Sequence, residues 1–187
     1  MTKKSGGLRA VITLVLITAV MALLLAAVNA ITAGPIAQAK AEKTEKALSG
    51  VLAEGVELKD PIQDFKDSTG LVKAVYATTD GYVIEVTPGG YGGEIDMVVG
   101  ISGGLTVTGV ELISHSETSG LGAYAAATGE KGQRFRNQFV GASGTLAVTK
   151  DAGAIDALTG ATVTSRAVTN GVNAALACAA TLEGGAE

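Results

Sequence analysis

The residue whose side chain could most clearly take part in chemistry is Thr162, a threonine in a loop of small residues that precedes a helical pattern. Gly160 and Ala161 keep side-chain bulk away from the backbone, and Ser165 is a candidate N-cap for the helix predicted at residues 166–182. Backbone N–H groups at a helix N-terminus, together with the helix dipole, favour a negatively charged group. The local sequence therefore predicts a loop that could hold a phosphate, with Thr162 able to carry it as an ester.

The longer pattern around this threonine narrows the interpretation, because Thr, Ser and Gly before a helix usually serve only as caps and turn residues. Asp156, two spacers and Thr159-Gly160-Ala161-Thr162, with another hydroxyl residue two places on, resemble the flavinylation motif of the FMN-binding domain family. Its members include the G subunit of the Rnf ion-translocating electron-transport complex and, as a more distant match, the C subunit of the sodium-pumping NADH:quinone reductase. In that family a flavin transferase joins FMN through its phosphate to the last Thr of the motif. The resemblance implies covalent FMN on Thr162, with Asp156, Thr159, Gly160 and Ala161 recognised by the transferase.

Further segments resemble the same family in the same order. Residues 115–122, His-Ser-Glu-Thr-Ser-Gly-Leu-Gly, are similar to its His-x-Glu-Thr-Pro-Gly-Leu-Gly segment, although Ser119 stands where Pro is usual. Residues 90–101 and 135–141 are similar to a glycine-rich turn with a strand and to a Phe-x-x-Gln-Phe-x-Gly segment. The resemblance implies two groups of FMN contacts, at the phosphate and along the ribityl chain or ring: Gly160, Ala161, Val163 and Thr164 for the first, and Glu117, Thr118, Leu121 and Gly122 for the second. For Leu121, simple core packing is an equal alternative.

The amino-terminal segment predicts a membrane anchor. Residues 10–39 carry no charged side chain, and residues 10–28 are apolar apart from Thr13 and Thr18, which is about the ~20 residues that a membrane-spanning helix needs. A cleaved signal peptide is the alternative, since basic residues precede the apolar run and Val28-Asn29-Ala30 resembles a cleavage site. Signal peptides have apolar regions of only about 7 to 15 residues. We therefore expect a retained transmembrane helix at residues 10–33.

The orientation of this helix is only weakly encoded by charge. Basic residues lie on both sides of the apolar run, with Lys3, Lys4 and Arg9 before it. A short basic tail is easier to retain inside than a basic cluster diluted by acidic residues, and large domains translocate largely regardless of charge. We expect a single-pass protein of the cell (inner) membrane. Residues 1–9 should lie in the cytoplasm and the globular domain outside the cytoplasm, as the family resemblance also implies.

Composition excludes several other classes of function. The formal net charge is −4, and no basic or aromatic-rich stripe predicts a nucleic-acid partner. Cys178 is the only cysteine and is expected to be a buried free thiol, so no intrachain disulfide or cysteine cluster is predicted. His115 is the only histidine, and no metal ligands are grouped around it, so we expect no metal site.

The rest of the chain predicts one α+β domain. Residues 34–70 are assigned to a stalk or capping helix region, with a polar helix at residues 41–52. Strands are predicted at residues 72–79 and 82–87 around Asp80-Gly81, at 95–101 and 105–113, and at 145–149, with helices at 122–128, 132–139 and 166–182. We expect residues 71–182 to form the FMN-binding domain, a twisted antiparallel sheet packed with helices, followed by a flexible tail at 183–187.

These features predict an electron carrier. Bound FMN supplies one- and two-electron chemistry, and the protein supplies position and electrostatics. No glycine-rich nicotinamide-binding turn follows a strand, so the isolated chain is not expected to turn over a small substrate. The resemblance implies a redox subunit of an Rnf-type complex that couples ferredoxin and NAD to sodium or proton movement, with other membrane subunits, a flavin transferase and the lipid bilayer as partners. Two alternatives stay open: a membrane-anchored docking or sensor module without redox activity, and the flavin subunit of another respiratory reductase.

Overall fold

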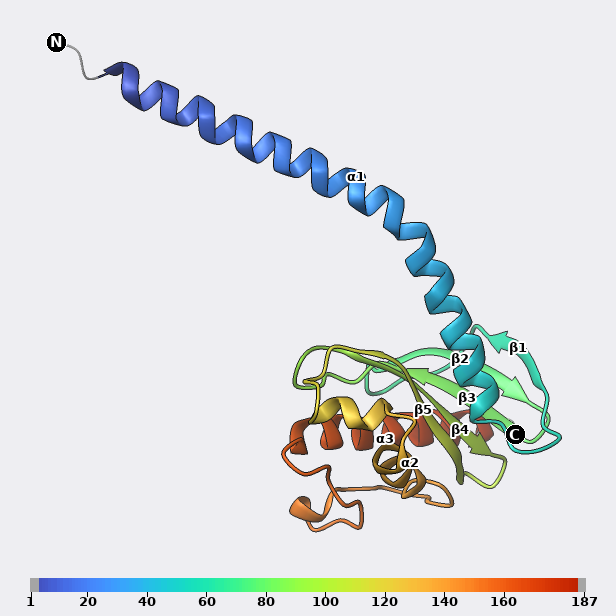
Figure 1. Ribbon diagram of the computed structural model, residues 1–187. Helices are drawn as coiled ribbons and strands as arrows, with labels where there is room; N and C mark the ends of the chain where they lie inside the picture. The colour runs from blue at the N-terminus through green and yellow to red at the C-terminus, as the bar shows by residue number, and fades with distance from the viewer. Residues whose placement is uncertain (1–3, 185–187) are drawn as a thin grey trace. The chain divides into compact units, whose positions relative to one another are not determined.

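The computed structural model describes residues 4–184, which fall into two compact units divided between Glu42 and Lys43 (Figure 1). The first unit is helical. The second contains the sheet, the remaining helices and the last turns of the amino-terminal helix. The expected α+β architecture, with an apolar helix preceding an antiparallel sheet domain, is confirmed.

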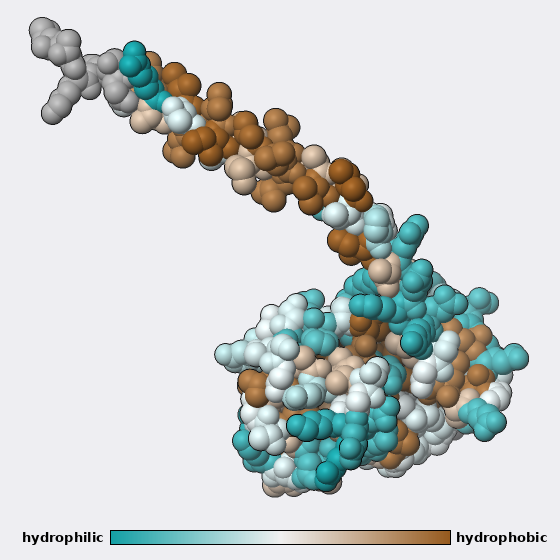
Figure 2. Space-filling model, viewed as in Figure 1, coloured by the Kyte–Doolittle hydropathy of each residue, from teal (hydrophilic) through white to brown (hydrophobic). Residues whose placement is uncertain are grey.

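Helix α1 spans Lys4–Gly50 without interruption. Within the part of α1 that begins at Gly7, the most apolar stretch of 18 residues has a mean hydropathy of 2.9, and none of that stretch is buried. Figure 2 shows hydrophobic side chains along this helix. The helix is long and apolar enough to cross a bilayer. The polar helix predicted at residues 41–52 is helical to Gly50, where it continues α1; its Ala, Lys and Glu residues are good helix formers.

The five strands form an antiparallel meander in chain order. They are β1 Leu58–Ile62, β2 Val72–Thr78, β3 Gly81–Val86, β4 Ile95–Ser102 and β5 Val107–His115. Strand β1 lies within residues 34–70, the expected stalk or capping helix region, where no strand was predicted. It escaped prediction because it is short and mostly exposed and contains Pro61, which suits only an edge strand. The prediction of a strand at residues 145–149 is wrong, since Val148 makes only an isolated bridge to Ile155.

The other helices follow the sheet. They are the 3₁₀ helix η1 Gly122–Ala126, α2 Glu130–Asn137, the 3₁₀ turn η2 Thr149–Asp151 and α3 Thr162–Gly184. The predicted helix at 122–128 is therefore shorter and of 3₁₀ type, and the one at 132–139 begins two residues earlier. Helix α3 begins at Thr162, four residues before the predicted start. Ser165 is consequently not an N-cap: its backbone N–H donates to the Ala161 carbonyl at 3.0 Å, within the first turn.

The core of the second unit lies on both faces of the sheet. Helix α3 packs against one face, where Cys178 is buried as expected and burial raises the pKa of its thiol. The core between them includes Ile84, Val86, Met97 and Val99 of the sheet and Val168, Val172 and Ala175 of α3. On the opposite face, Val51 lies over the paired glycines Gly100 and Gly109, and its carbonyl accepts a 2.9 Å hydrogen bond from Thr108 Oγ1. These two layers fix the loops at the ends of β4, β5 and α3.

Candidate functional site

Three segments that are distant in sequence meet around one cavity of about 490 Å³. They are the turn before β4, the loop that follows β5 and the first turn of α3 with its preceding loop. The cavity is lined by Tyr91, Glu117, Thr118, Leu121, Gly122, Gly160, Ala161, Thr162, Val163 and Thr164. The structure therefore brings together nine of the eleven residues singled out in the sequence for FMN attachment, FMN contact or recognition by the transferase.

Thr162 occupies the first position of α3 and is partly exposed. The first N–H groups of a helix have no intrahelical acceptors, so this position offers free donors and the positive end of the helix dipole. Lys150 Nζ donates to Thr162 Oγ1 at 3.0 Å. A negatively charged group attached to this hydroxyl would thus lie beside an ammonium group at a helix N-terminus.

Lys150 is held in place by its neighbour. Arg166 in the first turns of α3 donates two hydrogen bonds to Asp151, from Nε to Oδ2 at 2.7 Å and from Nη2 to Oδ1 at 2.6 Å. These bonds join η2 to α3, and the hydrogen bond from Arg166 holds the pKa of Asp151 below its ordinary value. The bidentate pair therefore positions Lys150 against Thr162, although twelve residues separate them in the sequence.

The loop before α3 is shaped by Ser165 and Gly160. Ser165 Oγ accepts a hydrogen bond from the Leu158 N–H and donates one to the Ala161 carbonyl, both at 2.9 Å. Gly160 has a φ of 75°, a left-handed conformation that glycine adopts without steric cost. The loop is thereby folded back over the helix start, with Thr162 facing the cavity.

Glu117 is the buried acid of the site and joins its three segments. Its Oε1 accepts a hydrogen bond from the Gly92 N–H at 2.9 Å, and its Oε2 accepts one from Thr164 Oγ1. A Cβ atom on Gly122 would lie only 2.6 Å from Glu117 Oε2, so this position requires glycine for close approach. Both carboxylate oxygens of Glu117 are therefore engaged in hydrogen bonds within the site.

Large hydrophobic side chains are exposed at the rim of the cavity. Outside α1, five large hydrophobic side chains are exposed in the described residues, and three of them line this cavity. Tyr91 is 73% exposed, Val163 48% and Leu121 42%. Exposed apolar groups that gather around a concavity favour an apolar ligand surface. Leu121 is therefore not a core residue, which answers the alternative left open by its sequence.

These features suit both the phosphate and the ring of FMN. A phosphate attached to Thr162 would meet Lys150 and the α3 N-terminus, and the Tyr91, Leu121 and Val163 side chains offer apolar surface to a flat ring. Gly160 and Gly122 line the cavity without side chains of their own. The residues present are thus chemically suited to the cofactor that the sequence predicted.

Two of the residues proposed from sequence lie outside the cavity. Asp156 and Thr159 are exposed in the loop before α3, and the Asp156 backbone is held on both sides by the Gln138 side-chain amide. Lys150 was not predicted from the sequence, and no cofactor contact was assigned to Tyr91. Nothing in the local spacing places Lys150 at Thr162, since only the fold of η2 onto α3 brings them together.

Comparison with known proteins gives consistent similarities. Residues 90–177 match the family model of the FMN-binding domain. The G subunit of the ion-translocating oxidoreductase complex of Methanosarcina acetivorans is 31% identical over 186 residues, with 94% of this chain and 96% of the relative covered. The G subunit of the Na⁺-translocating ferredoxin:NAD⁺ oxidoreductase complex of Acetobacterium woodii is 34% identical, covering 86% and 85%. The proton-translocating ferredoxin:NAD⁺ counterpart from Clostridium ljungdahlii is also 34% identical, covering 87% and 86%.

Proposed function

Since this chain belongs to the family of G subunits of ion-translocating oxidoreductase complexes, we propose that it is the electron-carrying subunit of such a membrane complex. We further propose that it holds FMN through a phosphoester to Thr162 Oγ1. The observation that supports this attachment most is the coincidence of a reactive hydroxyl, Lys150 Nζ at 3.0 Å and a helix N-terminus in one apolar-rimmed cavity.

The residues of the site have distinct tasks in this proposal. Lys150 and the α3 N-terminus stabilise the charge of the phosphodiester. Tyr91, Leu121 and Val163 provide apolar contacts and remain exposed, so a partner protein can approach the cofactor. Glu117 keeps the three segments of the site together through Gly92 and Thr164.

Covalent attachment fits a carrier rather than an enzyme with its own small substrate. FMN supplies one- and two-electron transfer when bound, and the chain provides its position and electrostatic surroundings. A tethered cofactor stays associated with an open site that would hold a free one weakly. We infer that the chain relays electrons between other redox centres and has no turnover of its own.

We place this chain beside other membrane subunits, with α1 as a single-pass anchor in the cell membrane, residues 1–9 in the cytoplasm and the FMN domain outside it. The apolar length of α1 supports the anchor. The basic residues before the apolar run support the orientation, because the basic residues after it are diluted by acidic ones. The two relatives named for sodium and for proton translocation are equally similar to this chain.

The proposal includes a maturation step by a flavin transferase. Asp156 and Thr159 are exposed in the loop before α3, where another protein can reach them. Gln138 fixes the backbone of Asp156 through hydrogen bonds of 2.7 and 3.2 Å, so the loop presents a defined shape. This arrangement supports recognition of the loop by an enzyme, with Thr162 as the acceptor.

Three forms of the chain, co-expressed with a flavin transferase, test the attachment. The wild type and Thr162→Ser should both show in-gel flavin fluorescence, because each has a hydroxyl at this position. Thr162→Val has nearly the same shape without the hydroxyl and should show none, while its circular dichroism spectrum stays unchanged. Fluorescence retained by a folded Thr162→Val chain would contradict the assignment.

A further inference from the structure

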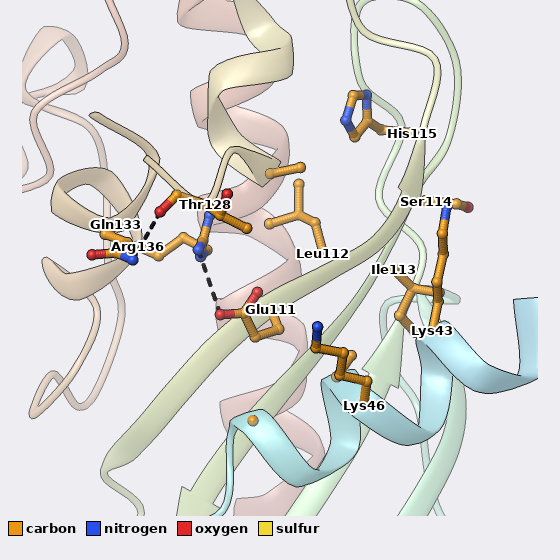
Figure 3. Close-up of a pocket in the computed structure, with 13 residues that line it drawn as sticks. Lys43, Lys46, Glu111, Leu112, Ile113, Ser114, His115, Thr128, Gln133 and Arg136 are labelled. Atoms are coloured by element: carbon orange, nitrogen blue, oxygen red, sulfur yellow. Dashed lines mark hydrogen bonds and ion pairs between the residues drawn. The ribbon is translucent and has the colours of Figure 1, made fainter. Parts of the chain in front are cut away.

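A second cavity, of about 570 Å³, lies along the outer edge of β5. Strand β5 ends the sheet, and its outer side is paired only at Val107, through Gly141 and Ala142, among the described residues. Residues 111–115 beyond that point line the cavity, between the end of α1 and the η1–α2 segment (Figure 3). An unpaired strand edge presents backbone N–H and C=O groups that can accept another strand.

The charge of this edge groove is positive, although the whole chain carries a formal net charge of −4. Its cationic side chains are Lys43, Lys46 and Arg136, and Glu111 is its only carboxylate. Arg136 is buried and already engaged, since it donates to the carbonyls of Ala125 at 2.7 Å and Ala127 at 3.0 Å and lies 3.5 Å from Glu111. Arg136 is therefore a structural residue of the groove lining, and Lys43 and Lys46 are the cations that a ligand could contact.

Lys43 and Lys46 are exposed and extend from α1 toward β5 (Figure 3). Among the described residues, neither ammonium group has a hydrogen-bond or ion-pair partner. Residues three apart on a helix have Cβ atoms about 5–6 Å apart. Side chains on one face of a strand recur at roughly 7 Å. The two lysines therefore have a spacing that suits two acidic side chains on one face of an extended segment.

We propose that the edge groove binds an extended acidic segment of a neighbouring subunit. The segment pairs with β5 at residues 111–115 as an added strand, and its carboxylates face Lys43 and Lys46. Five consecutive strand residues extend over roughly 17 Å, much longer than a single small anion. The combination of an unpaired strand edge and two cations beside it favours a peptide over an inorganic ion.

Charge reversal tests the electrostatic half of this proposal in the native complex. The complex is purified from membranes through a tag on this chain, as wild type, as Lys43→Glu with Lys46→Glu, and as Lys59→Glu with Lys66→Glu. The last pair is exposed, lies outside the edge groove and makes the same charge change. We expect the first double variant to retain the neighbouring subunits about tenfold less well at physiological salt. The control pair should match the wild type, and both variants should keep their flavin fluorescence.

Backbone pairing is tested by hydrogen exchange at the amides of residues 111–115. The amides in this segment that point away from β4 should exchange about tenfold more slowly in the complex than in the isolated full-length chain, because an added strand protects them. A photo-reactive benzoylphenylalanine in place of Gln133, at the groove, should then crosslink to an acidic segment of another subunit. Equal retention of subunits by the two double variants, or equal exchange in the two states, would overturn the proposal. So would a crosslink only to lipid or to a second copy of this chain.

Discussion

Replacing Lys150 with Gln should slow the attachment of FMN to Thr162. Lys150 Nζ lies 3.0 Å from the acceptor oxygen, so an incoming phosphate would come within about 4 Å of the ammonium charge. At that distance two unit charges interact by on the order of 1 kcal/mol in water, and by more where solvent is partly excluded. Because 1.36 kcal/mol corresponds to a factor of ten, we expect the attachment rate to fall about five- to tenfold.

The assay measures the initial rate of in-gel flavin fluorescence after mixing the full-length chain with flavin transferase and its flavin donor. Lys150→Arg should keep most of the rate, because it preserves the positive charge. Lys66→Gln, at an exposed position remote from the site, serves as the matched control. The difference should shrink in 1 M salt, where the Debye length is about 3 Å. Attachment by Lys150→Gln at the wild-type rate would refute the role of this charge.

Two further predictions concern the framework of the site. Gly122→Ala should destabilise the fold by about 1–3 kcal/mol, because its Cβ would collide with Glu117; thermal unfolding measures this, with Gly89→Ala, whose Cβ meets open space, as control. The Asp151–Arg166 pair should stabilise the fold only where Asp151 is ionised: its folded pKa is lowered, so the contribution is present above the ordinary value of 3.8 and is lost as the pH falls through the lowered pKa. Urea unfolding midpoints of the wild type and Asp151→Asn should therefore differ at neutral pH and converge below pH 3.8; a constant difference across that range would contradict the linkage.

Strong local patterns were sufficient to predict most of the sheet. Residues Thr79 and Asp80 join β2 to β3, next to the expected Asp80-Gly81 turn, and the strand predicted at residues 95–101 is β4. Strand β1 could not be predicted in the same way, because its pairing with β2 depends on tertiary contact rather than on alternation within Leu58–Ile62. The strand predicted at 145–149 has β-forming residues, but no neighbouring strand pairs with them beyond a single bridge.

Those parts of the candidate site whose residues are close in sequence could be predicted. The parts that only the fold brings together could not. The loop before α3 and the segment after β5 each had a recognisable pattern, and the structure places both at one cavity. The start of α3 was misplaced because Ser165, a good N-cap by type, instead satisfies the Leu158 N–H from within the helix. Lys150 could not be found, since its position depends on the Asp151–Arg166 pair.

Covalent FMN on Thr162 should be visible in the mass of the chain purified from its native membrane. Ester formation with loss of water predicts an increase of about 438 Da over the mass of the unmodified chain. Fragmentation should assign the added mass to the peptide that contains Thr162. An unmodified mass, or an adduct assigned to another residue, would contradict the account.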